Sequence, residues 1–283
     1  MTAITALIKR HPLTAFFTLA CSLTWFGGWA SDALYNGTLL SIALALPLAL
    51  LIPGPLIAAL IVTTITSGKP GLRALLRSLT HWRVGLRWYL IALLLPAALS
   101  LFAVYLNVLL GAPAPTAAQF GSWSSLLFMF GLRLVNPFDG PVMEELGWRG
   151  YALPRLQARY SPLTANLILG VVVAIWHLRW IMNGDLPGVY LPAIIAATIL
   201  FGWIVNSTQG SVLLALLFHA ADGLLIQGNF GLTGTDATRL LWLQVAVWCL
   251  MAIVVVLARG RNLGSSVAHP TLPDERATEG VYV

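Results

Sequence analysis

The stretch Met143–Gly150, with the sequence MEELGWRG, places two adjacent carboxylates, Glu144 and Glu145, at the end of a long apolar run. Taking two carboxylates out of water beside a bilayer is costly, so ionisable side chains in this position are expected to belong to a functional site. The rest of the chain supports a membrane setting, since 58% of its residues are hydrophobic and only 9% are charged. Soluble domains carry roughly 25% charged residues, which this chain lacks.

The apolar runs are long and continuous rather than alternating, which predicts membrane-spanning helices. We therefore expect an all-α, polytopic membrane protein of about eight transmembrane helices with an intramembrane polar site. The predicted spans are 12–30, 38–66, 88–110, 123–148, 162–182, 190–206, 211–228 and 239–258. Pro53-Gly54-Pro55 should kink or break the second span, and Pro137 and Pro141 disturb the fourth.

The chain shows no second domain, so residues 1–261 are predicted to form a single transmembrane domain. Residues 262–283 are polar and contain prolines, which predicts a loose cytoplasmic tail. Arg133 lies inside the fourth span, and we expect its charged head to snorkel to the interface, with a partner carboxylate as the alternative.

The basic residues gather in loops that an eight-span topology places on one side of the membrane. These clusters are Lys9 and Arg10; Lys69, Arg73, Arg77, Arg83 and Arg87; Arg149, Arg155 and Arg159; and Arg259 and Arg261. The positive-inside rule then predicts that both termini are cytoplasmic. Lysine is nearly absent whereas arginine is plentiful, which is typical of a GC-rich bacterial genome, so we expect the membrane to be a bacterial plasma membrane. With no basic face on a soluble module, nucleic acid is not an expected partner.

The carboxylate doublet divides into two predicted roles. Glu145 and Arg149 are at i and i+4 on a helix, with the acid first, which favours an ion pair. Glu144 points about a quarter-turn away and stays free to act as a general base. The structural alternative is a carboxylate cluster that only holds helices together.

Two further predicted spans carry the remaining candidates. His177 lies in the fifth span, whereas His219 and Asp222 lie one turn apart in the seventh. A lone histidine in a helix is often a hydrogen-bonded core residue, so the argument depends on all these polar groups converging. In that case, Glu144 would take a proton from water, His177 would position that water, and His219 would stabilise an oxyanion.

The sequence is compatible with a metal ion in the site and also with none. Two histidines and a carboxylate suit zinc, and Glu144, His177 and His219 would then be the ligands. However, the chain has no His-Glu-x-x-His helix, so the site is also compatible with no metal at all.

The segments Glu144–Tyr151 and Leu153–Leu156 resemble the Glu-Glu-x-x-x-Arg motif of the CAAX-protease and bacteriocin-processing family, over a core of about residues 120–230. The resemblance implies an eight-helix intramembrane peptidase related to the type II CAAX prenyl endopeptidase. It assigns water activation to the position of Glu144 and support to His177 and His219.

The family's second and third motifs are changed in this chain. Val173 stands where Phe is frequent, four residues before His177. In the third motif, His-x-x-x-Asn or Asp, Gly223 occupies the last position and Asp222 precedes it. Whether Asp222 takes over that role is left open.

Three functions are compatible with these patterns. The first is a glutamate-dependent endopeptidase that cleaves a membrane-associated polypeptide, with prenylated substrates improbable in a bacterium. The second is a non-catalytic membrane scaffold or immunity protein that keeps the fold. The third is a proton-coupled transporter, which is disfavoured because the chain shows no internal repeat.

Overall fold

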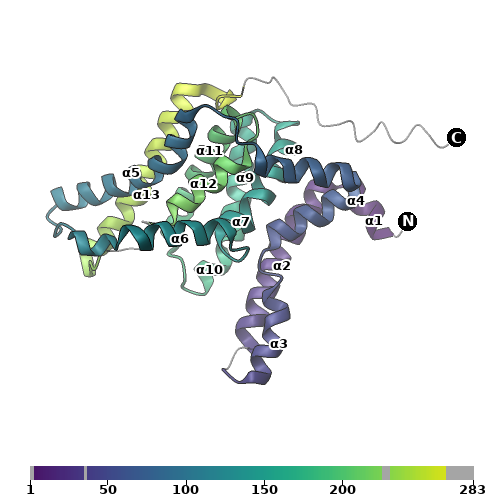
Figure 1. Ribbon diagram of the computed structural model, residues 1–283, viewed down its shortest axis with the longest axis horizontal. Coiled ribbons are helices and arrows are strands. Elements are labelled where there is room, and N and C mark those ends of the chain that lie inside the picture. The colour runs from purple at the N-terminus through teal and green to yellow at the C-terminus, as the bar shows by residue number, and fades with distance from the viewer. Residues whose placement is uncertain (1–2, 35–36, 225–229, 266–283) are drawn as a thin grey trace.

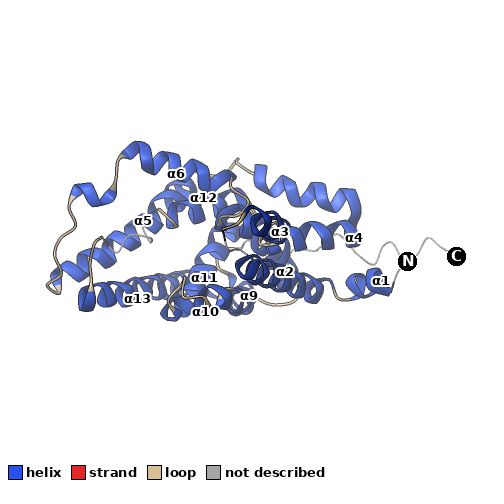
Figure 2. Cartoon of the chain, turned by 90° about the horizontal axis from the view of Figure 1, so that it is seen from below, coloured by secondary structure: helices blue, strands red, loops and turns tan. Residues whose placement is uncertain are grey.

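The computed structural model describes residues 3–34, 37–224 and 230–265, and every regular element in these ranges is helical (Figure 2). This confirms the predicted all-α membrane class. The elements are α1 (Ala3–Arg10), α2 (Pro12–Leu34), α3 (Leu39–Ala49), α4 (Gly54–Arg77), η1 (Ser78–Thr80), α5 (Leu86–Leu109), η2 (Ala117–Phe120), α6 (Trp123–Val135), α7 (Gly140–Glu145), η3 (Leu146–Ala152), α8 (Leu153–Gln157), α9 (Pro162–Trp176), α10 (Leu178–Met182), η4 (Gly188–Tyr190), α11 (Leu191–Ser207), α12 (Val212–Asp222), α13 (Gly234–Arg259) and η5 (Gly260–Asn262).

The described residues contain six helices that are long and apolar enough to cross a membrane, so the predicted count of eight is not confirmed. They are Pro12–Leu34, Gly54–Thr80, Leu86–Leu109, Pro162–Met182, Gly188–Ser207 and Gly234–Asn262. Two shorter apolar helices, α3 and α12, fall within the predicted second and seventh spans. The last residues of that seventh span, 225–228, lie outside the described residues.

The predicted break at Pro53-Gly54-Pro55 is present between α3 and α4. Thr24 of α2 holds this break, because its hydroxyl donates to the carbonyl of Ile52 at 2.8 Å and accepts from the backbone amide of Gly54 at 3.2 Å. A side chain at position 54 would overlap Thr24, so glycine permits α2 and α4 to approach closely.

The predicted span 123–148 is wrong as a single helix. Asn136, which precedes Pro137, is extended with φ −79° and ψ 111°, as a residue before proline prefers. The chain restarts at α7, where the side chain of Asp139 accepts from the amide of Gly140 at 2.7 Å. The helix then widens into a π-helical segment, η3, which carries Arg149. Such segments are frequent at functional sites.

Helices α5, α9, α11, α12 and α13 pack side by side, and α2 packs on α3 and α4 beside them (Figure 1). The short helix α7 packs on α12, and η3 packs on α4. The close approach of α4 depends on Gly147, since a Cβ there would lie 2.6 Å from the Pro55 carbonyl oxygen. Through these contacts, the segment that holds both glutamates is fixed between α4 and α12.

The predicted single domain over residues 1–261 stays a prediction. At its end, Leu263 is fully buried, although the sequence places it in the tail. The remainder of the tail, residues 266–283, lies outside the described residues.

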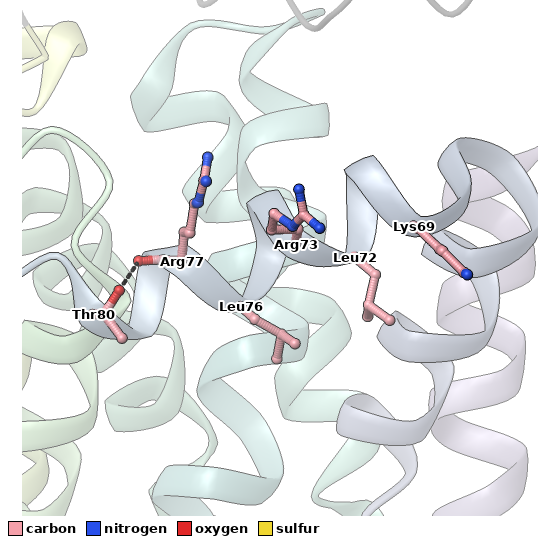
Figure 3. A pocket seen from close by; sticks show the side chains of 6 residues that line it. All are labelled: Lys69, Leu72, Arg73, Leu76, Arg77 and Thr80. Carbon is pink, nitrogen blue, oxygen red and sulfur yellow. Dashed lines mark hydrogen bonds between the residues drawn. The ribbon is translucent and has the colours of Figure 1, made fainter.

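The second half of α4 forms an amphipathic surface segment. Gly68 has φ 58° and ψ −154°, so α4 bends at this residue. Beyond the bend, Arg73 and Arg77 project from one side and Leu72 and Leu76 from the other, along a shallow pocket of about 460 Å³ (Figure 3). A helix with this pattern suits the membrane interface, with its arginines toward the aqueous phase.

The predicted orientation can be tested at Arg73. We expect Arg73→Cys, with Cys21 and Cys249 replaced by alanine, to react with a membrane-impermeant maleimide in inside-out vesicles. Ala114→Cys is the matched probe, because Ala114 is exposed and the single candidate span Leu86–Leu109 separates it from Arg73. It should react in right-side-out vesicles instead. The reverse pattern would contradict cytoplasmic basic loops.

Candidate active site

The site is built around a buried ion pair between Glu145 and Arg149. Glu145 Oε1 lies 3.1 Å from Arg149 Nη1, and the two side chains are 0% and 3% exposed. Arg149 is also placed by its guanidinium carbon, which lies 4.0 Å from the ring centroid of Phe201 on α11. The i, i+4 pair that the spacing predicts is therefore present, and it joins the end of α7 to η3.

Glu145 also orients His219 of α12. The same carboxylate oxygen lies 2.7 Å from His219 Nδ1. A carboxylate has no proton to give, so Nδ1 carries the hydrogen and donates it, and in a neutral ring Nε2 is then a hydrogen-bond acceptor. The ring packs edge-on against Phe201, with 5.5 Å between centroids. These contacts direct Nε2 away from Glu145.

Nε2 of His219 instead faces Glu144, whose Oε1 lies 4.0 Å away. Glu144 is 5% exposed and belongs to the last turn of α7. Gly140 lies one turn earlier, and a Cβ at that position would be 2.5 Å from His219 Nε2 and 3.2 Å from Glu144 Oε1. Only glycine therefore leaves the space beside these two groups free of a side chain.

His177 and Asp222 line a pocket next to this cluster. His177 Nδ1 is 2.9 Å from the carbonyl oxygen of Val173, and its ring packs against Trp176 and Trp180. His177 and Asp222 line one pocket of about 180 Å³ between α11, α12 and α13. Oδ1 of Asp222 is buried without a hydrogen-bond partner in the described part of the chain.

Thus the four predicted catalytic residues fall into two groups. Glu144 and His219 face each other, whereas His177 and Asp222 share the adjacent pocket. Helix α12 connects the groups, because it carries both His219 and Asp222.

Arg133 is buried and forms a second ion pair with the partly exposed Asp139, a pair that the sequence pattern did not predict. Arg133 is 7% exposed, and its Nη1 lies 3.0 Å from Asp139 Oδ1. The expected snorkelling of Arg133 is therefore wrong, and a partner carboxylate is present. Asp139 lies inside the predicted span 123–148, so its place in an apolar run was the signal that could have identified it.

The predicted metal ligands are not arranged as a metal site. Among the described residues, no three His, Cys, Asp or Glu side chains are grouped closely enough to hold an ion. Nδ1 of His219 is engaged by Glu145, and Nδ1 of His177 by its own helix. Zinc therefore stays a prediction of the sequence, and no chemical step is derived through it.

Two comparisons with known proteins cover the part of the chain that contains this site. Residues 121–225 match the model of the family described as type II CAAX prenyl endopeptidase Rce1-like. The chain is also similar to CAAX prenyl protease 2 of Methanococcus maripaludis, with 26% identity over 281 aligned residues that cover 88% of this chain and 94% of the relative. The matched segment contains Glu144, His177 and His219. This segment is therefore similar to an Rce1-like domain, as the Glu-Glu-x-x-x-Arg resemblance predicts, and both matches indicate a membrane protease.

Proposed function

We propose that this protein is an intramembrane endopeptidase in which Glu144 activates the water that attacks a peptide bond. The observation that supports this most directly is the 4.0 Å separation of Glu144 Oε1 and His219 Nε2, beside a glycine that adds no side chain. A carboxylate and a neutral imidazole nitrogen are both acceptors, so one water can donate a hydrogen bond to each. Its lone pair is then left for the substrate carbonyl.

The side chains of this protein supply the proton transfers that hydrolysis of the peptide bond needs. The water oxygen attacks the carbonyl carbon, its proton passes to Glu144, and the carbonyl electron pair moves onto oxygen. When the tetrahedral intermediate collapses, the C–N bond breaks and Glu144 returns the proton to the leaving amine. Glu145 supports these steps by fixing the ring of His219, and Arg149 holds Glu145 in place.

The substrate class follows from the surroundings of the site and from the relatives. The site lies among apolar helices, so the substrate is a polypeptide that reaches it from the bilayer. We propose that cleavage occurs near the carboxyl end of such a polypeptide, next to a lipid-modified or apolar segment. The pocket of His177 and Asp222 would hold substrate groups next to the scissile bond.

Gly140→Ala provides a test that leaves every polar group of the site in place. The added methyl group would press on His219 Nε2, so we expect kcat to fall by about 10²-fold through misplacement of the ring. The measurement is cleavage of an internally quenched peptide with a farnesylated Cys-x-x-x end, by the full chain in proteoliposomes. The same peptide without the lipid shows whether the prenyl group is needed.

Gly131→Ala is the matched control. A Cβ at position 131 meets nothing within 4 Å, so this variant should cleave like the parent protein. Equal activity of Gly140→Ala and Gly131→Ala would contradict a catalytic contact between Glu144 and His219. A parent protein that cleaves neither peptide would favour the non-catalytic scaffold instead.

A further inference from the structure

At the end of α12, the guanidinium of Arg133 lies where the family's third motif would have the side chain of Asn or Asp. Gly223 follows His219 by four residues, so the two positions share one face of the helix. A Cβ built on Gly223 would overlap Cζ and Nη2 of Arg133, which belongs to α6. The guanidinium therefore fills the volume that a side chain at position 223 would take, one turn from the imidazole of His219.

This guanidinium is tied to both helices that carry the proposed catalytic groups. Its Nη1 lies 3.0 Å from Asp139 Oδ1, and the same oxygen accepts from the amide of Gly140 at the start of α7. Its Nη2 donates to the carbonyl of His219 at 3.5 Å. The cation is thus fixed between the Gly140 end of α7 and the His219 turn of α12.

The guanidinium also has unused hydrogen-bonding capacity. Its Nε is buried and has no hydrogen-bond partner within the described ranges. A donor of this kind is costly to bury unless a ligand or reacting group uses it.

A pocket of about 440 Å³ leads to the same cation. It is lined by Ser125, Leu126 and Met129 of α6 together with Arg133, Asp139 and Gly223. This volume is in the range of ligand pockets, and its α6 wall combines apolar Leu126 and Met129 with polar Ser125 and Arg133, so it can contact both the side chains and the backbone of a peptide.

We propose that the guanidinium of Arg133, clamped by Asp139 and seated over Gly223, binds the substrate carbonyl oxygen and stabilises its negative charge. This inference rests on the peptidase function proposed above. As water adds to the carbonyl carbon, the C=O electron pair moves onto oxygen, and a fixed cation lowers the energy of that charge. The charge returns to a carbonyl when the C–N bond breaks, so Arg133 exchanges no proton.

The test compares kcat and KM for the farnesylated quenched peptide in proteoliposomes. Arg133→Gln should lower kcat by about 10²- to 10³-fold with little change in KM, because a group that acts on the developing charge affects the transition state. Arg133→Lys keeps the charge and should retain more activity than Arg133→Gln.

A compensating pair separates this role from a purely structural one. Gly223→Asn alone should be impaired, because its Cβ overlaps the guanidinium. Arg133→Ala removes that overlap, so Arg133→Ala/Gly223→Asn presents a carboxamide donor at the same place. We expect the double variant to recover about tenfold in kcat over Arg133→Ala, as one restored hydrogen bond to the oxyanion can supply.

Arg239→Gln is the control, since Arg239 also pairs with an aspartate, Asp236 at 2.6 Å, but at the start of α13 and with both side chains more exposed. Its kcat should equal that of the parent. Unchanged kcat in folded Arg133→Gln, or no rescue by Gly223→Asn, would overturn this inference while Glu144-dependent cleavage remained. Loss of the proposed function itself would appear differently, as a parent protein that does not cleave or a Glu144→Gln variant that does.

Discussion

Glu144→Gln is expected to abolish peptide cleavage while the protein remains folded. The amide is nearly the same size as the carboxylate, so packing around the buried position is kept, but it cannot take a proton from water. The loss of a positioned general base costs about 10²- to 10⁴-fold in rate. We expect kcat for the farnesylated quenched peptide to fall by this amount or more, because Glu144 also returns the proton to the leaving amine.

Substitution of Glu144 should disturb fewer polar contacts than substitution of Glu145. Among the described residues, the ion-pair partner of Glu144 within 4.0 Å is His219 Nε2, and that distance is too long for a direct hydrogen bond. Glu145, in contrast, has an arginine at 3.1 Å and an imidazole at 2.7 Å on one oxygen. Glu144→Gln should therefore melt close to the parent protein in a detergent-solubilised thermal scan.

His219→Gln supplies the second arm of the experiment. It removes the acceptor that faces Glu144, and its kcat should also fall, whereas Gly131→Ala should not change it. If Glu144→Gln is folded and still cleaves with the parent kcat, water activation by Glu144 is wrong.

The fold class was predictable because the length and composition of an apolar run are enough to show that it can be buried in a bilayer as a helix. The failures concern where helices stop. Span 123–148 was predicted as one span that Pro137 and Pro141 disturb, whereas the structure ends α6 at Val135. A proline in a membrane helix is compatible with a kink or with a full break, and the packing of α7 on α12 decides between them.

That same break explains why the Arg133–Asp139 pair was not predicted. The two residues are six apart, so on a continuous helix they would lie on different faces. Because the helix is interrupted by a turn between Asn136 and Asp139, the side chains of Arg133 and Asp139 meet at 3.0 Å. The Glu145–Arg149 pair was predictable because i, i+4 spacing survives the passage from α7 into η3.

The grouping of the candidate residues was predictable only in part. The rarity of polar groups in the spans indicated that they would gather, and Glu144 and His219 do so. Sequence spacing could not show that His177 and Asp222 line one pocket together with Trp248. That pocket depends on how α11, α12 and α13 pack, which is a tertiary property.

Breaking the Glu145–Arg149 pair is expected to produce the largest loss of stability. Glu145→Leu would leave the guanidinium of Arg149, which is only 3% exposed, without its carboxylate. Removal of one partner of a buried pair costs about 3–5 kcal/mol, because the remaining charge stays desolvated. The measurement is the free energy of unfolding in a mixed-micelle SDS titration, with Arg149→Leu as the reciprocal variant.

Asp236→Asn tests whether burial is the reason. The Asp236–Arg239 side chains are 35% and 27% exposed, so the loss of that pair should cost no more than about 1 kcal/mol. Equal losses for Glu145→Leu and Asp236→Asn would contradict an effect of desolvation.

The double variant Glu145→Leu/Arg149→Leu then separates stability from chemistry. It leaves neither charge buried alone, so it should regain much of the stability that each single variant loses. Activity should not return with it, because His219 Nδ1 has lost the carboxylate that holds it at 2.7 Å. A protein that is stable again but still inactive would show that Glu145 acts by orienting His219 and not only by holding α7 to η3. A double variant with restored cleavage would show that the ring needs no such anchor.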